Sequence, residues 1–279
     1  MKLLIILVAI GLEKYAQIGG LLKRFLWFDT YLQSIEKLFS KQQRFLQSWL
    51  AVFVIVLPIV ITVGLIYWLI QDFAFGLVGL LLNLFILLYC LGPDDLYHQL
   101  RCTLRGEHDD ACEKTLFEQV PKTVQLDDSH KLSQAILILA NERFFAVIFW
   151  FILLGPIGAV TYRLTVLLRH RAENNHLELA SCGREAVRLQ QLLDWIPARF
   201  TAILYMVVGS FQAGIKQWCQ CFFSGLGNNI YLLQQCGMAA LGNGREESES
   251  ALAALDLVEH ALIVILVIIA IFTLGAWIV

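Results

Sequence analysis

The segment Leu50–Ile70, LAVFVIVLPIVITVGLIYWLI, contains no charged residue. A helix needs about 20 apolar residues to cross the hydrocarbon core of a bilayer, so this segment predicts a transmembrane helix, with a kink at Pro58. The composition of the whole chain also indicates a membrane protein. Of its 279 residues, 58% are hydrophobic and 16% are charged, whereas in soluble domains about 45–50% are apolar and about 25% are charged. We therefore predict an all-α, polytopic integral membrane protein.

A second uncharged segment, Phe73–Gly92, follows after a short turn at Gln71 and Asp72. Its one strongly polar side chain is Asn83. Residues 50–92 therefore predict a transmembrane hairpin. Seven Lys and Arg precede the first segment and none lies in the turn. Because basic residues accumulate on the cytoplasmic side, we expect a cytoplasmic N-terminus and an external turn.

Residues 1–48 form an amphipathic N-terminal segment in this interpretation. The apolar run Leu3–Leu12 is too short to span a bilayer, and we expect it to stay in the mature protein as a buried or interfacial helix. Between Leu21 and Phe39, apolar residues recur at helical spacing with basic residues mostly opposite. This pattern is typical of a helix lying on the anionic inner leaflet, and packing against protein is the alternative.

Residues 93–142 predict a cytoplasmic helical segment with three acidic pairs and nearby histidines. Carboxylates and imidazoles are metal-ligand types, but their spacing matches no metal-binding motif. Solvated helix ends and N-caps are therefore the favoured interpretation, and we predict no metal and no cofactor. The residues concerned are Asp94, Asp95, Asp109, Asp110, Asp127, Asp128, His98, His108 and His130.

Residues 143–212 predict a core of interrupted helices. Gly155 and Pro156 break the apolar segment Phe144–Thr161, which becomes either one kinked span or a re-entrant hairpin of two half-helices. Five arginines between residues 163 and 188 would be disfavoured outside the cytoplasm, which favours the hairpin. We expect a second break at Pro197, before a short apolar helix over Phe200–Phe211.

The rest of the chain predicts a polar loop and helix over residues 213–260 and a final span over residues 261–279. Ser224–Gly244 is rich in glycine and asparagine, which is typical of a loop. The seven cysteines form no CxxC pair and are expected to be free thiols in reducing surroundings. We treat residues 1–279 as a single domain.

Arg199 lies at the edge of an apolar segment, within Asp194–Phe200, DWIPARF. An arginine at such a depth usually faces a cavity or a headgroup and is a functional candidate, although snorkelling to lipid phosphates is an alternative. Its planar guanidinium pairs bidentately with carboxylate or phosphate. We therefore predict that a small anionic ligand, or a headgroup, is bound by Arg199, Arg163, Arg184, Asp194 and Glu142.

Three blocks of sequence carry a resemblance to a known family. They are Phe144–Trp150 with Gly155–Ala159 and Tyr162-Arg163, then Gly183-Arg184, and then Asp194–Ala202. The chain resembles the CobD/CbiB membrane family, whose enzymes condense an adenosylcobyric acid carboxylate with an aminoalcohol or its phosphate in cobalamin synthesis. It is most similar to the AmpE branch, which is described as inner-membrane modulators of β-lactamase induction and is paired genetically with the muropeptide amidase AmpD.

The chain departs from the enzyme pattern at its acidic positions. The expected Glu-x-x-Ala-Glu-Asn cluster reads Ile136–Glu142, where only Glu142 is acidic. Val166–Arg169 replaces an Asn-Thr-x-Asp run, and Gln190 and Gln191 replace paired aspartates. Mg²⁺ on a nucleotide substrate requires carboxylate oxygens. The resemblance therefore implies a member without catalytic residues.

The resemblance implies a regulatory protein of the bacterial inner membrane, linked to peptidoglycan recycling. Two alternatives remain open: a ligase or transferase acting on a phosphorylated or corrinoid substrate, and a transporter of a small anionic solute. A net charge of −2 without a basic stripe argues against nucleic-acid binding. Membrane phospholipid is the expected partner, and homo-oligomerisation is left open.

Overall fold

The computed structural model describes residues 2–16, 25–39, 49–70, 77–91, 116–122, 124, 126–127, 129–174, 180–222, 225–242 and 247–278. Every regular element within these ranges is a helix, which confirms the predicted all-α class. The chain forms two compact units, one of Met1–Asp95 and Val147–Gln190 and one of Leu96–Ala146 and Gln191–Val279. Each unit is described by itself, and the single domain expected from the sequence stays a prediction.

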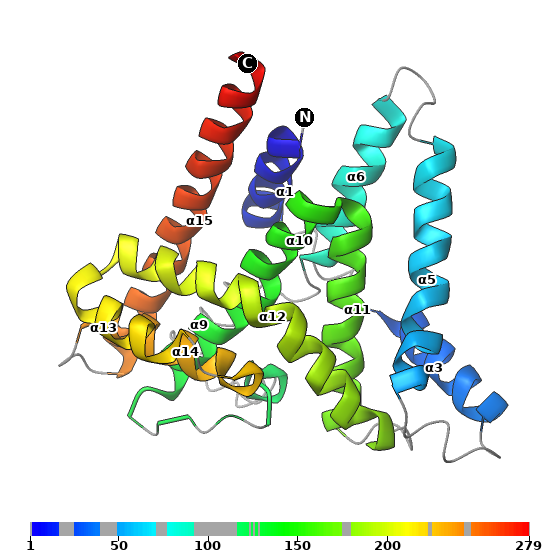
Figure 1. Cartoon of the computed structure of the whole chain (residues 1–279), viewed down its shortest axis with the longest axis horizontal. Helices are drawn as coiled ribbons and strands as arrows, with labels where there is room; N and C mark the ends of the chain where they lie inside the picture. Colours follow the sequence, from blue (N-terminus) through cyan, green and yellow to red (C-terminus); the bar gives the residue numbers. More distant parts are fainter. Residues whose placement is uncertain are drawn as a thin grey trace. The chain divides into compact units, whose positions relative to one another are not determined.

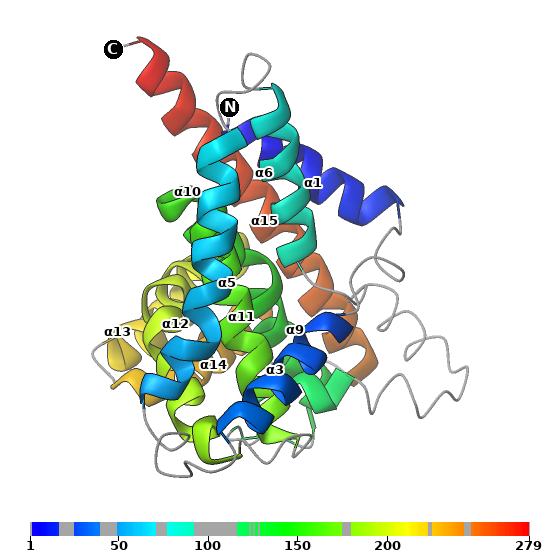
Figure 2. The ribbon, with the colours of Figure 1, turned by 90° about the vertical axis from the view of Figure 1, so that its right-hand side faces the viewer.

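The first unit is built around helix α11, which packs against both α5 and α6, while α1 packs against α6 (Figure 1). In Figure 2, α5 and α6 run beside each other. The helices of this unit are α1 (Lys2–Ala16), α3 (Leu26–Phe39), α5 (Trp49–Ile70), α6 (Leu77–Cys90), α10 (Ala146–Leu154, of which all but the first residue belong here), α11 (Pro156–Glu173) and the first part of α12 (Ala180–Val208).

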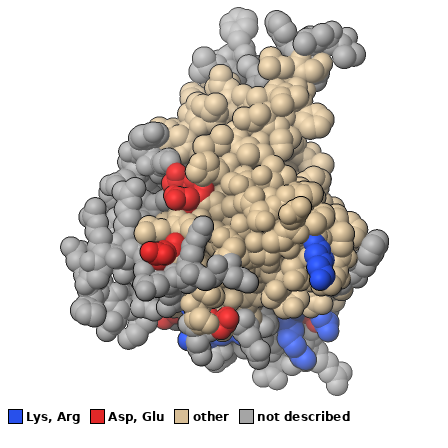
Figure 3. All heavy atoms as spheres, turned by 90° about the vertical axis from the view of Figure 1, so that its left-hand side faces the viewer, with Lys and Arg blue, Asp and Glu red and all other residues tan. Residues whose placement is uncertain are grey.

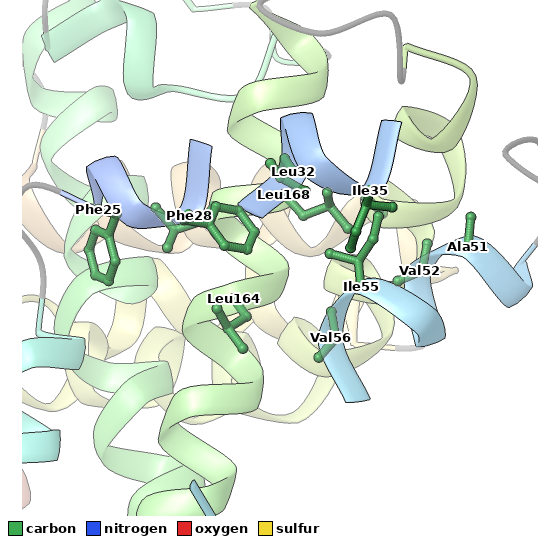
Figure 4. Packing of buried hydrophobic residues seen from close by; sticks show 12 residues of the cluster. Phe25, Phe28, Leu32, Ile35, Ala51, Val52, Ile55, Val56, Leu164 and Leu168 are labelled. Atoms are coloured by element: carbon green, nitrogen blue, oxygen red, sulfur yellow. The ribbon is translucent and has the colours of Figure 1, made fainter. Parts of the chain in front are cut away.

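The apolar face of α3 is buried inside the first unit. Its residues Phe28 and Leu32 are fully buried in a cluster with side chains of α5, α11 and the first part of α12, and Figure 4 shows those of α5 and α11. An ion pair of 2.9 Å between Arg171 Nε and Asp29 Oδ1 fastens α3 to α11. The helix is amphipathic, as predicted. The prediction that its apolar face lies on the inner leaflet is wrong, because these side chains are removed from water by packing on neighbouring helices.

The second unit is built around helix α9, which packs against α14 and α15, while α13 packs against α14. The loop predicted over Ser224–Gly244 is wrong between Asn229 and Leu241, where α14 forms because Leu232, Cys236 and Ala240 recur at helical spacing and are buried. The elements of this unit are α9 (Lys131–Ala140), the π-helix η2 (Asn141–Phe145), the second part of α12, α13 (Phe211–Cys221), η3 (Leu226–Asn228), α14 (Asn229–Leu241) and α15 (Glu247–Ile278).

Three helical stretches of the described chain are long and apolar enough to cross a membrane, Trp49–Ile70, Lys131–Leu154 and Glu249–Gly275. The first confirms the membrane-length apolar helix predicted over Leu50–Ile70, whereas the kink at Pro58 stays a prediction. The second begins inside residues 93–142, which we predicted to be cytoplasmic. It does so because α9, η2 and α10 follow one another without a break. The third belongs to α15, which continues without a break through residues 260 and 261, where we predicted the polar helix to end and the final span to begin. The second expected span is represented by the shorter helix α6, and residues 71–76 lie outside the described ranges.

The predicted break at Gly155 and Pro156 is confirmed. Gly155 has φ +70°, which separates α10 from α11, and Pro156 opens α11, where its missing N–H costs no hydrogen bond. The break predicted at Pro197 is wrong, since α12 is continuous from Ala180 to Val208. A side-chain donor supports the helix beside this proline, because Arg199 Nη1 donates to Trp195 O at 2.7 Å. Whether these segments span or re-enter the bilayer stays a prediction.

Candidate functional site

The π-helix η2 interrupts the apolar stretch Lys131–Leu154 with the polar sequence Asn141-Glu142-Arg143. All five residues of η2 are buried. The hydrogen-bond pattern shifts here, because the Asn141 N–H bonds to Ile138 O and the Ala146 N–H bonds to Asn141 O, five residues back. Single π-turns within α-helices frequently occur at functional sites, and polar residues in an apolar helix are functional candidates.

Helix α12 supplies hydrogen bonds to this irregular turn. The Tyr205 hydroxyl donates to Leu137 O at 2.9 Å, and the Thr201 hydroxyl donates to Asn141 Oδ1 at 2.8 Å. Thr201 and Tyr205 stand one helical turn apart on α12, so a single face of that helix reaches both acceptors. The Tyr205 ring also meets Phe145 edge to face, with ring centroids 5.8 Å apart. The α-to-π transition is therefore held by specific partners from another helix.

Glu142 and Arg143 bring charge into the interior of the second unit. Both are only 4% exposed, and Arg143 Nη2 donates to the Gln119 Oε1 acceptor. Burying a charge is costly unless it is paired or hydrogen-bonded. The bond to Gln119 also ties the short helical turn at residues 116–119 to η2.

Arg199 links three helices of the same unit. Its Nε and Nη2 atoms donate to Phe222 O, just past the end of α13, at 3.1 and 2.8 Å. Its Nη1 donates to Asn229 Oδ1 on α14 at 3.1 Å, and the guanidinium lies 4.1 Å from the centroid of the Trp195 ring. A cation is favoured at a helix C-terminus, where carbonyl groups lack helical partners.

Burial lowers the pKa of Arg199 from its ordinary value, yet a guanidinium keeps its proton in proteins. The positive charge therefore persists, and these contacts give Arg199 a structural role in joining α12, α13 and α14. Asn229 extends the linkage, because its Nδ2 donates to Gln191 O at 2.6 Å. Binding of an anion by Arg199 stays a prediction.

The five residues predicted to bind a ligand are divided between the two units. Arg199, Asp194 and Glu142 belong to the second unit and are buried. Arg163 and Arg184 belong to the first, where Arg163 is buried 5.6 Å from the centroid of the Phe25 ring and Arg184 is exposed near the start of α12.

Sequence reasoning missed the side chains that give the site its geometry. The prediction did not include Thr201, Tyr205 and Asn229, because a hydroxyl or an amide in an apolar helix is common. The available signal was the polar triplet at residues 141–143 in a long apolar run. Recognising that run as one helix would have pointed to η2.

The acidic pairs of residues 93–142 fall mostly outside the described ranges. Asp94, Asp95, Asp109 and Asp110 lie there, as does Asp128. Asp127 is described, and its Oδ1 accepts a hydrogen bond from Ser129 Oγ at 3.0 Å, just before α9 begins. Within the described ranges, no three His, Cys, Asp or Glu side chains are grouped closely enough to hold a metal ion.

Curated relatives with significant similarity are cobalamin biosynthesis proteins. The protein CobD of Stutzerimonas stutzeri (strain A1501) is 30% identical over 99 residues, which are 34% of this chain and 33% of that protein. CobD of Chromobacterium violaceum is 33% identical over 85 residues, 30% of this chain and 27% of its own length. The probable CobD of Methanocaldococcus jannaschii is 28% identical over 174 residues, 55% and 56% of the two chains.

This chain therefore spans about a third or less of the length of the first two relatives. No solved structure is significantly similar to it. The profile of a family described as "Regulatory signalling modulator protein AmpE" matches residues 1–279. The match covers the entire sequence, and it agrees with the helical membrane architecture and with the similarity to CobD proteins. The chain belongs to the AmpE family.

Proposed function

We propose that this protein is a non-catalytic regulator at the bacterial inner membrane, with its N-terminus in the cytoplasm, that modulates β-lactamase induction in connection with peptidoglycan recycling. The supporting observation is the family match over residues 1–279, whose description is that of a regulatory signalling modulator. The proposed functional partner is the amidase AmpD, through a shared pathway rather than through a contact assigned to particular residues.

We further propose that the regulator senses a small anionic ligand. Buried charge supports this proposal, because Glu142, Arg143, Asp194 and Arg199 all lie inside the second unit, where apolar side chains would cost less desolvation energy. The proposed ligand residues remain Arg199, Arg163, Arg184, Asp194 and Glu142. Since they are divided between two units, they are tested by single variants, one in each unit.

The experiment measures β-lactamase activity induced by a sub-inhibitory β-lactam in a strain that lacks this protein. The strain is supplied again with the wild-type protein or with single variants at matched membrane abundance. Arg184→Ala is the most informative variant, because Arg184 is exposed and its removal leaves the packing intact. Arg188→Ala is its matched control, one turn later on the same helix and also exposed.

We expect wild type and Arg188→Ala to restore the normal response and Arg184→Ala to reduce it. Equal responses from Arg184→Ala and wild type would remove Arg184 from the ligand site. An unchanged response in the strain without the protein would contradict the regulatory function itself. Arg199→Lys provides a further test that retains the charge but loses the planar fork.

The second candidate function is enzymatic, and it is favoured by the similarity to proteins named for cobalamin biosynthesis. A residual ligase or transferase would consume ATP in the presence of a cobyric-acid-type substrate. Purified protein in vesicles is incubated with ATP, Mg²⁺ and that substrate, and phosphate release is measured against a sample without substrate. Substrate-dependent release would contradict the non-catalytic proposal.

A further inference from the structure

The second part of α12 has a polarity opposite to that of a helix on a soluble protein. Four large apolar side chains of this helix are 39–55% exposed and form what we call the apolar stripe: Leu192, Ile196, Phe200 and Val207. At 3.6 residues per turn, their directions fall within about 80° around the helix axis. The stripe is therefore one narrow, continuous face.

The side of the same helix opposite the stripe carries buried polar groups. At 3.6 residues per turn, Asp194 and Thr201 lie about 180–200° from Leu192 around the helix axis, and both are at most 6% exposed. An amphipathic helix in water buries its apolar face and exposes its polar face. The reverse arrangement is stable where the surroundings are less polar than the interior of the protein, because each polar group then finds its partners inside.

The stripe is too short to belong to a spanning helix. From residue 192 to residue 207 it extends about 22 Å at 1.5 Å per residue, whereas the hydrocarbon core is about 30 Å thick. Helix α12 is also not among the candidate spans. In Figures 1 and 2, the second part of α12 runs across the direction of α15, which is one of them.

One exposed cationic side chain precedes the stripe on the same helix. Arg188 lies one turn before Leu192, and its Nη1 is 3.1 Å from Glu185 Oε1. A long basic side chain next to an apolar segment is able to reach the lipid phosphates while its stem stays in the apolar layer. In Figure 3, which views the molecule from the left-hand side of Figure 1, charged side chains occupy isolated places on a broad uncharged surface.

We propose that the apolar stripe of α12 lies among phospholipid acyl chains, so that this half of α12 is an in-plane membrane helix. Such helices bury their apolar face about 5–10 Å into the boundary between headgroups and acyl chains. A second copy of the chain is a poorer occupant, because a stable protein interface needs about 800 Å² on each partner. Four side chains that are about half exposed offer less than that.

Photocross-linking tests this placement. Benzoylphenylalanine is introduced at Phe200 or Val207, and the purified full-length protein is reconstituted in vesicles of phosphatidylethanolamine and phosphatidylglycerol. Ile271 on α15 serves as the positive control, because it is 64% exposed on a candidate span. Asp256 is the matched control at an exposed polar position on the same helix. After irradiation, mass spectrometry identifies the adducts.

We expect lipid adducts at Phe200, Val207 and Ile271, with at least a fivefold lower yield at Asp256. Cross-linked dimers at Phe200 and Val207 would overturn the proposal in favour of a second copy. Adducts at Ile271 alone would overturn it as well. Two positions are used so that poor folding of one variant does not decide the result. The readout does not involve β-lactamase, so failure of this membrane placement is distinguishable from failure of the proposed function.

Discussion

Two membrane-length stretches of this protein differ in what surrounds them. Within Trp49–Ile70, an 18-residue window has a mean hydropathy of 2.9 and 22% of its residues are buried; within Lys131–Leu154, the corresponding window has a mean hydropathy of 2.0 and 78% of its residues are buried. The first, helix α5, leaves Phe53, Leu57 and Ile61 exposed. The second contains the polar turn η2 and is enclosed along most of its length.

The difference teaches that apolar length and burial are separate properties. Lipid can solvate the exposed side of α5, but it offers no hydrogen-bond partner to Asn141 or to the Leu137 carbonyl. Those groups are satisfied by Thr201 and Tyr205 of α12. The stretch with the lower hydropathy is therefore the one that depends on protein neighbours.

The largest expected effect compares Leu137→Ala with Leu57→Ala. Leu137 is fully buried and Leu57 is 45% exposed. Leu137→Ala should lower the free energy of unfolding by about 3 kcal/mol through loss of contacts and a cavity, whereas Leu57→Ala should change it by less than about 0.5 kcal/mol, as for exposed sites. Unfolding by sodium dodecyl sulfate in mixed micelles measures both. Equal losses would contradict the contrast between the two stretches.

A second substitution sharpens this test. A Cβ atom added at Gly237 would lie 2.6 Å from Leu137 Cδ1, so the two side chains compete for one space. Gly237→Ala should therefore restore part of the stability lost in Leu137→Ala, while it destabilises the wild-type protein. Purely additive effects of the two substitutions would show that this contact is absent.

A smaller effect is expected from Tyr205→Phe, which removes the hydroxyl that donates to Leu137 O. A buried carbonyl left without this partner should cost about 1–2 kcal/mol in the free energy of unfolding. Tyr231→Phe is the control, since Tyr231 is 52% exposed and should lose nothing measurable. If both tyrosines tolerate the change equally, the hydroxyl does not stabilise the π-turn.

The smallest effect is expected from Thr201→Val, which keeps the shape of the side chain but loses the bond to Asn141 Oδ1. Side-chain hydrogen bonds between membrane helices contribute about 0.6 kcal/mol on average, and we expect a loss of about that size in the same unfolding assay. Thr62→Val on α5 removes only a local bond to Pro58 O at an exposed position. A greater loss from Thr62→Val would reverse the comparison.

The sequence by itself determined the features that depend on local chemistry. The uncharged length of Leu50–Ile70 indicated a membrane helix because transfer into hydrocarbon depends on the residues of the segment itself. The break at Gly155 followed from backbone chemistry, since φ +70° is readily adopted by glycine and proline favours the first helical position.

Only the tertiary structure decided features whose partners lie far along the chain. The helix continues through Pro197 where Arg199 bonds to Trp195 on the same helix and to Phe222 and Asn229 on later segments. The apolar face of α3 is buried because α5 and α11 cover it. The π-turn at Asn141 receives hydrogen bonds from residues 60 or more positions away. Local propensity contains no information about such partners, and their hydrogen bonds and packing outweigh it.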